Sequence, residues 1–459
     1  MAAERRRTDM VLVAFMQAQN CTNYPGSWRH PRGIPDFLSA EHYMRIARTL
    51  EEGRFHLAFF DDRLAMPDIY GNDHKPAVQW GIRSVKMDPI PLMTAMGLAT
   101  RHLGIGGTRT TTYYEPFDVA RTFMTLDHMI GGRAAWNVVT SMNDSEARNM
   151  GVAAHMDHDL RYDAADEFVE CVLGHWQSWE DGSLVVDTGP GGQFAQPDKV
   201  HRIDYEGRWY RSRGPFTVPR SPQGQPVLIQ AGQSGRGVQF AGRWGELVFA
   251  SYRTIPQAKA LYRALKDAVA SNGRNPDHVK IAPPVYPILG ETRAIAQEKR
   301  DFAHALARDE DALCLLGEIL NLDFTQWGLD DPIDAKLLDS MTGQHAIRDR
   351  IRQVSGKPNP TPRDFIEISK RGTIYEAPVF CGTAADVADQ MEEWYREEAC
   401  DGFVCAATHR PGGYEDVCRL LVPELQRRGI FQKGYRGTTL RENLGLPPSM
   451  ATGRPTMRH

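Results

Sequence analysis

Long hydrophobic runs are missing from this sequence. No stretch approaches the roughly 20 consecutive apolar residues that a membrane-spanning helix needs. The basic start, MAAERRR, leads into no apolar run, so we expect neither a membrane span nor a targeting signal. A strong excess of one charge is missing too. The net charge of -4 gives no general reason to expect nucleic acid or a membrane surface as partner.

Paired cysteines and short metal-binding motifs are also missing. The seven cysteines are scattered with no CxxC pair, which favours reduced thiols and a cytoplasmic protein. Neither HxH nor HExxH occurs, although His155, Asp157, His158 and Asp159 stand close together. We therefore expect helix-capping residues in that cluster and no metal site.

Short β-rich apolar runs alternate with amphipathic helical patterns along the whole chain. The runs lack strict alternation, as expected for parallel strands covered on both faces. Eight such strands, each followed by a helix, predict a (β/α)8 TIM barrel. A doubly wound sheet is the alternative, but no GxGxxG motif follows the first strand. The predicted strands are Met10–Asn20, Phe55–Asp62, Leu103–Thr112, Arg133–Ser141, Pro226–Gly232, Glu246–Ser251, Val279–Gly290 and Gly402–His409.

Two segments are longer than barrel loops require. Residues 181–225 are rich in glycine and proline, and they predict a hairpin that turns at Glu206–Gly207. Residues 291–377 are mostly helical and charged. We expect a single domain over residues 1–459 with these two insertions, the second acting as a lid over the site.

Polar residues stand at the carboxyl ends of the predicted strands, where barrels bind their ligands. Each of them alone has a plain alternative role as a cap for the next helix. Their coincidence at one rim favours a ligand site. The rim comprises Asn20, Cys21, Asp61, Asp62, Thr108 to Thr112, Asn137 to Ser141, Gln230 to Ser234, Ser251, Thr408 and His409.

Two stretches indicate where an anion would bind. In LIQAGQSGRG a strand leads through Gly232–Gly237 into a helix, so backbone N–H groups can approach an oxyanion at a helix N-terminus. A glycine-rich turn without a ligand is the alternative. His158 and Tyr162 stand four residues apart, on one face of the first turn of a predicted helix. They can hold an anionic group, or they can be solvated residues at a helix start.

Several motifs together resemble a known family. TYYEP, ARTFMTLDHMIGGRAAWNVVTS, EARNMG, HDLRYDAADEF and VLIQAGQSGRG occur in this order. They resemble the nitrilotriacetate monooxygenase component A family, a branch of the bacterial-luciferase-like FMN-dependent monooxygenases. The family implies a luciferase-like (β/α)8 barrel that assembles as a homodimer or homotetramer. It also implies FMNH2, delivered by a separate NAD(P)H-dependent flavin reductase, which activates O2 to oxidise a small organic substrate.

The resemblance also implies site residues, carried over by matching motif positions. Flavin contacts are implied for Asp62, Thr108, Asn137 and Ser141. His158 and Tyr162 are implied near the ribityl phosphate. Ser234, with the backbone at Gly235, is implied in the phosphate loop.

Two positions depart from the family pattern. Arg109 stands where relatives carry a small residue, which changes the charge of the pocket. In the long-chain alkane monooxygenase relative, a Cys follows the first strand and a catalytic His comes three residues later. Here Cys21 is kept and Tyr24 takes the His position, which argues against direct transfer of the alkane reaction.

Two residues are candidates for catalysis. His409 ends the last predicted strand and is a candidate for proton transfer to or from substrate, with a surface-loop histidine as the alternative. Cys21 is the other candidate, and packing against the strand is its alternative role. Three further functions stay open: a riboflavin-degrading enzyme that gives lumichrome, a deazaflavin-dependent enzyme, and a flavin-binding protein without turnover.

Overall fold

The computed structural model describes residues 10–33, 35–141, 144–232, 235–341, 343, 345–372 and 377–449. Its helices are α1 Ala40–Glu52, α2 Lys75–Trp80, α3 Pro89–Leu98, α4 Pro116–Met129, α5 Asp144–Asn149, α6 His158–Trp176, α7 Gly235–Trp244, α8 Ile255–Ser271, α9 Arg293–Ala305, α10 Asp309–Leu320, α11 Ala335–Ser340, α12 His345–Ser355, α13 Pro362–Ile368, α14 Ala384–Arg396, α15 Gly412–Asp416, α16 Val422–Arg427 and α17 Leu440–Leu444. Within the described ranges, no helix is long and apolar enough to cross a membrane.

Parallel strands form a closed barrel, which confirms the predicted fold class. Their order around the barrel is β1 (Val11–Gln17), β2 (Leu57–Asp61), β3 (Gly104–Thr110), β4 (Ala134–Val139), β7 (Val227–Gln230), β8 (Leu247–Phe249), β9 (Lys280–Ala282) with β10 (Pro284–Leu289), and β12 (Gly402–Ala406). Each predicted strand is present. The sheet closes because β8 pairs with β9, β10 pairs with β12, and β12 pairs with β1.

The seventh barrel strand is interrupted at Pro283, where the sequence predicts one strand. A proline has no N–H to donate, so it breaks the ladder. Its carbonyl still accepts a bond from Val404 N at 2.8 Å, which keeps β9 and β10 in line against β12. Beyond the break, β10 also pairs with an unpredicted strand outside the barrel, β11 (Val379–Gly382).

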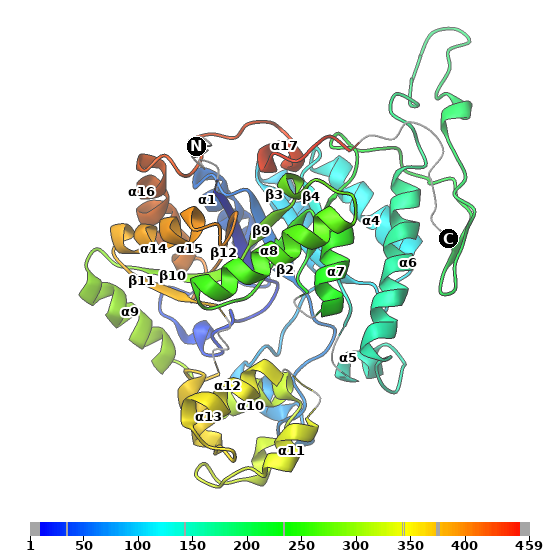
Figure 1. The fold of residues 1–459 in the computed structure, drawn as a ribbon. Helices are drawn as coiled ribbons and strands as arrows, with labels where there is room; N and C mark the ends of the chain where they lie inside the picture. Colours follow the sequence, from blue (N-terminus) through cyan, green and yellow to red (C-terminus); the bar gives the residue numbers. More distant parts are fainter. Residues whose placement is uncertain are drawn as a thin grey trace.

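The barrel interior is apolar at one end. Val13, Leu57, Ala135, Ile229 and Val404 belong to one buried cluster inside the sheet. Helix α17 adds leucines to the same cluster and covers this end, at the top of Figure 1. A larger core lies between the outside of the sheet and the surrounding helices.

Within the insertion from 291 to 377, helices α10 to α13 form a lobe at the opposite end of the barrel from α17, at the bottom of Figure 1, whereas α9 lies beside β10 and β11. A separate hydrophobic cluster holds its helices together, with Leu315 from α10, Ile351 from α12 and Phe365 from α13. Ala77 of α2 belongs to that cluster too, so the lobe packs onto a barrel loop.

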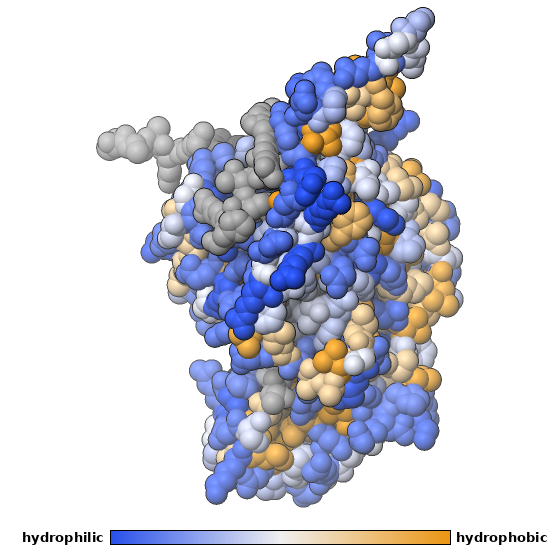
Figure 2. Space-filling model, turned by 90° about the vertical axis from the view of Figure 1, so that its right-hand side faces the viewer, coloured by the Kyte–Doolittle hydropathy of each residue, from blue (hydrophilic) through white to orange (hydrophobic). Residues whose placement is uncertain are grey.

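The insertion from 181 to 225 contains a short antiparallel pair, β5 (Tyr205–Glu206) and β6 (Arg211–Ser212), at the predicted hairpin. Before this pair, the chain makes an arm closed by a bridge between Leu184 and Ala195. Figure 2 shows the arm projecting from the top of the molecule, and apolar residues scattered over the visible face.

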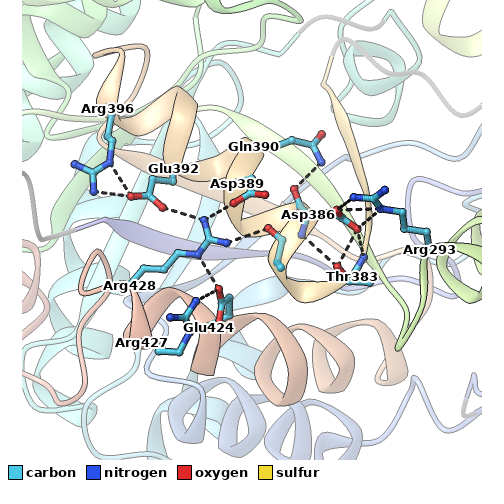
Figure 3. Close-up of polar contacts among 11 residues, drawn as sticks. Arg293, Thr383, Asp386, Asp389, Gln390, Glu392, Arg396, Glu424, Arg427 and Arg428 are labelled. Atoms are coloured by element: carbon cyan, nitrogen blue, oxygen red, sulfur yellow. Dashed lines mark hydrogen bonds and ion pairs between the residues drawn. The ribbon is translucent and has the colours of Figure 1, made fainter.

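Ion pairs join the helices that cover β10 and β11. Arg428, just after α16, bonds to Asp389 at 2.7 Å and to Glu392 at 2.9 Å, both on α14 (Figure 3). Arg293 at the start of α9 bonds to Asp386 of α14 at 2.6 Å. The exposed Arg293 contributes little by its pair, whereas the largely buried Arg428 ties the end of α16 to α14.

Candidate active site

The interior of the barrel becomes polar toward the carboxyl ends of the strands. Side chains on a strand alternate between the two faces. The inward register that includes Val13 on β1 and Ala135 on β4 therefore continues to Gln17 and Asn137. Thr108 lies opposite Asn137 on the neighbouring strand β3. The sequence thus builds an apolar plug with a polar layer above it, at the end of the barrel where ligands bind.

Two residues predicted as flavin contacts bond to each other. Asn137 Nδ2 donates to Thr108 Oγ1 at 2.8 Å, and that hydroxyl donates to the carbonyl of Phe60 at 2.9 Å. The Asn137 side chain is only 3% exposed, and its Oδ1 has no hydrogen-bond partner among the described residues. A buried acceptor left without a donor costs free energy, so this oxygen fits a donor group on a ligand.

Ser141 has a structural bond that the sequence did not predict. Its Oγ donates to Thr110 Oγ1 at 3.2 Å, and its backbone N–H also donates to that oxygen at 3.1 Å. These bonds fix the end of β4 against the end of β3. Its role as a flavin contact stays a prediction.

Asp62 lines a large cleft near this rim, with a volume of about 300 Å³. Burial raises the pKa of its carboxyl to about 7, against the opposing influence of the nearby Lys86 and Arg109 cations. The side chain therefore changes charge near neutral pH. Arg109, the departure from the family pattern, lines the same cleft.

Tyr162 lies against the glycine turn that precedes α7, although the two are some 70 positions apart in sequence. A β-carbon built on Gly232 would lie 3.0 Å from the Tyr162 hydroxyl and 3.0 Å from the α-carbon of Gly237. The turn accepts no side chain at Gly232, so backbone and phenol approach closely there. The structure thus brings together two elements that the sequence predicted separately as anion sites.

The structure describes the other residues predicted to contact the cofactor phosphate only in part. Gly235 is the first residue of α7, and a β-carbon added there would meet nothing within 4 Å. His158 begins α6, and its side chain lies outside the described residues, as does the whole of Ser234. Their roles as cofactor contacts stay predictions.

Sequence reasoning missed Arg161, one residue before Tyr162. Its Nη1 donates to the carbonyl of Met156 at 2.7 Å, while its Nε is buried without a partner among the described residues. Burial lowers its pKa. A partly buried guanidinium with a free donor, on the same first turn of α6 as His158 and Tyr162, suits a phosphate. The signal was present in HDLRYD as a basic residue within the first turn of α6.

Cys21 is buried beside a smaller cavity of about 100 Å³. Burial raises the pKa of its thiol despite the Arg83 and Arg410 cations nearby, so the thiol is protonated at neutral pH. The Arg410 guanidinium donates to the carbonyls of Gln19 at 2.6 Å and Cys21 at 3.2 Å. Tyr24 is buried too, and its ring stacks on His304 of α9.

His409 is 5% exposed, and its ring stacks on that of His30 with 3.5 Å between the ring centres. Burial, followed by the nearby His30 and Arg32, lowers its pKa to about 3. The imidazole is therefore neutral at pH 7. Within the described part of the chain its Nε2 has no partner, and His409 does not line the large cleft. Proton transfer by His409 stays a prediction.

The insertion lobe is fastened to loops of the barrel by ion pairs. Asp311 of α10 is fully buried and bonds to Arg29, which follows β1, at 2.7 Å. Glu318 of the same helix bonds to Arg63, which follows β2, at 2.5 Å. The lobe thus forms a fixed wall beside the carboxyl ends of the first two strands.

Comparison with known proteins identifies the family. The family model described as luciferase-like monooxygenase matches residues 15–401. This chain belongs to the luciferase-like monooxygenases. The predicted resemblance is confirmed, and the protein is an enzyme of the monooxygenase class.

Relatives cover nearly the whole chain. It is 40% identical over 454 residues to the dibenzothiophene-sulfone monooxygenase of Rhodococcus erythropolis, covering 98% of this chain and 100% of the relative. It is 35% identical to nitrilotriacetate monooxygenase component A of Aminobacter aminovorans, covering 94% and 96%. A crystal structure of riboflavin lyase with modified FMN and riboflavin superposes with a TM-score of 0.85 at 30% identity, covering 98% and 97%.

Proposed function

We propose that this monooxygenase binds FMNH2 at the polar end of its barrel and uses it with O2 to oxidise a small organic substrate. The observation that carries the proposal is the contact between Tyr162 and the turn at Gly232, a cradle that a side chain at Gly232 would fill. The unpartnered Oδ1 of Asn137 supplies the matching acceptor in the barrel interior.

These residues fit a flavin mononucleotide. Its phosphate would be held by Tyr162, Arg161 and His158 together with the N-terminus of α7 at Ser234 and Gly235. Its ring system would meet the polar layer of Asp62, Thr108, Asn137 and Ser141. When bound, the reduced flavin supplies the electrons that activate O2. The protein binds and orients the reactants, and the insertion lobe excludes water from the mouth.

The reduced flavin requires a donor, and we assign that role to a separate NAD(P)H-dependent flavin reductase. Subunits A and B of the pristinamycin IIA synthase of Streptomyces pristinaespiralis are both similar to this chain, so that relative has two subunits. We expect this chain to act in the cytoplasm as a homodimer or homotetramer.

Anaerobic titration tests the cofactor. We expect FMNH2 to bind more tightly than reduced F420, the deazaflavin used elsewhere in this superfamily. Binding of F420 without FMNH2 would overturn the proposal. Turnover with a flavin reductase, NADH and ¹⁸O2 should then place one labelled oxygen in an accepted substrate, with dibenzothiophene sulfone and nitrilotriacetate as the first two candidates.

A second function calls for a parallel assay because the superposed riboflavin lyase takes riboflavin as substrate. Riboflavin added with FMN, reductase, NADH and O2 would give lumichrome if this chain shared that reaction. Absence of lumichrome removes the riboflavin-degrading alternative. A flavin-binding protein without turnover would show no substrate-dependent NADH consumption above the rate of H2O2 release.

A further inference from the structure

The large cleft beside Asp62 has a wall rich in cations. Arg63, Arg83, Lys86 and Arg109 all line it, and the acids among the described lining residues are Asp62 and Asp88. Its volume of about 300 Å³ suits a small organic molecule. Because Asp62 is the predicted flavin contact at this cleft, the remainder of the space lies where a substrate would be bound.

Three of the four cations are already neutralised by carboxylates of the protein. Arg63 bonds to Glu318, and Lys86 bonds to Asp61 at 2.6 Å. Arg109 bonds to Asp88 at 2.6 Å, and its other terminal nitrogen donates to the Tyr114 hydroxyl. These pairs hold their side chains in place and leave little net charge for a ligand.

Arg83 differs from the other three. Its Nη2 donates to Asn23 Oδ1 at 3.0 Å, and its Nε is buried without a hydrogen-bond partner among the described residues. No carboxylate of the described chain pairs with it. Asn23 accepts a further hydrogen bond from Gln17 Nε2 and donates one to the Tyr286 hydroxyl. The partner of the Arg83 guanidinium is therefore a neutral amide fixed in position.

We propose that Arg83 binds the acid group of the substrate and that the enzyme therefore acts on an organic carboxylate or sulfonate. A partly buried guanidinium without a counter-charge is unfavourable, and an oxyanion compensates it. The planar fork of arginine matches the paired oxygens of such a group. The oxidised part of the molecule then extends toward Asp62. Oxidation of the bound acid rests on the proposed function, whereas binding of the acid by Arg83 does not.

Calorimetric titration of matched probes tests the binding directly. Benzoate is compared with benzamide, and benzenesulfonate with methyl phenyl sulfone, on the flavin-free protein and on the protein with FMN. We expect each acid to bind at least about ten-fold more tightly than its neutral partner, as a charge-assisted hydrogen bond implies. Arg83→Gln should abolish that preference, and Arg83→Lys should keep part of it.

Arg427→Gln is the matched control, since it removes one cation from a side chain that is 72% exposed on α16. It should leave the acid preference unchanged. Equal binding of acids and neutral partners by the wild type would overturn the proposal, as would an acid preference that survives in Arg83→Gln or falls equally in Arg427→Gln. Anaerobic titration with FMNH2 measures the cofactor separately. Acid binding without FMNH2 binding refutes the proposed function alone, and FMNH2 binding without acid preference refutes this inference alone.

Discussion

The amide of Asn137 and the hydroxyl of Thr108 face each other across β4 and β3 and are joined by a 2.8 Å hydrogen bond. The amide oxygen of Asn137 is buried and has no hydrogen-bond partner in the part of the chain that the structure describes. We expect Asn137→Ala to weaken FMNH2 binding and to lower the free energy of unfolding by about 1 kcal/mol, the net value of one hydrogen bond. Thr108→Ser keeps the hydroxyl and should change FMNH2 affinity little. Unchanged affinity in Asn137→Ala would contradict this assignment.

The close approach at Gly232 gives a second prediction. A methyl group there would lie 2.5 Å from Gln230 Nε2 and 3.0 Å from the Tyr162 hydroxyl, so Gly232→Ala must displace one of them. We expect at least a ten-fold loss of FMNH2 affinity, as for one charge-assisted hydrogen bond. Tyr162→Phe should cause a similar loss. Gly434→Ala is the control, because nothing lies within 4 Å of its added methyl group; equal losses in both glycine variants would argue against the cradle.

Asp62 predicts a dependence of stability on pH. Burial raises the pKa of this carboxyl from 3.8 to about 7, so between these values the folded protein holds a proton that the unfolded chain has lost. Its contribution to the free energy of unfolding therefore falls as pH rises from about 4 to 7 and is level above. The free energy of unfolding of Asp62→Asn, compared with that of the wild type, should therefore be higher at about pH 8 than at about pH 4.5. Urea unfolding of both proteins at these two pH values measures the change. The same difference at both pH values would refute the raised pKa.

The ion pairs of Asp311 hold α10 against the barrel, and their loss should lower both protein stability and the share of NADH oxidation that leads to product. Asp311→Ala leaves two arginines without their carboxylate. We expect a loss toward the lower end of the roughly 3–5 kcal/mol for breaking a buried pair, because both arginines are partly exposed. Hydrogen exchange should quicken across α10, and more H2O2 should be released per NADH. Asp330→Ala breaks an exposed pair with Arg363 in the same lobe and should do neither.

His409 supplies the last prediction. With a pKa of about 3 it is neutral under assay conditions, and its Nε2, which has no partner among the described residues, is free to hydrogen-bond a substrate. We expect His409→Ala to slow product formation while FMNH2 affinity stays unchanged. The shape of the rate profile above about pH 6 should also stay the same, since His409 does not titrate there. A wild-type rate in the variant would remove His409 from the mechanism.

The sequence predicted the barrel because each strand is a local apolar run bounded by turn residues. It missed β11, whose four residues Val379–Gly382 are too short to give a periodic signal. It treated β9 and β10 as one strand because the break is a single residue, Pro283. Both errors arise because strands are predicted from local sequence patterns, and neither changes the fold class.

The site was harder to predict because its contacts join distant residues. The motifs placed Tyr162 and Gly232 in separate elements, and only their packing shows that the phenol meets the turn. Arg83 and Lys86 lie in the loop between α2 and α3, where basic residues carry no periodic signal. Which arginine has a carboxylate partner depends on tertiary contacts, so the charge of the cleft could not be read from its residues alone.

The pairing of β1 with β12 also constrains the order of events during synthesis. Val11 pairs with Gly402, and Arg410 binds the carbonyl of Gln19, so one edge of the first strand waits for a partner made almost 400 residues later. An unpaired edge strand is a template for wrong pairing. The barrel can therefore close only after residues 402 to 410 have been synthesised, and until then the free edge of β1 is open to wrong pairing.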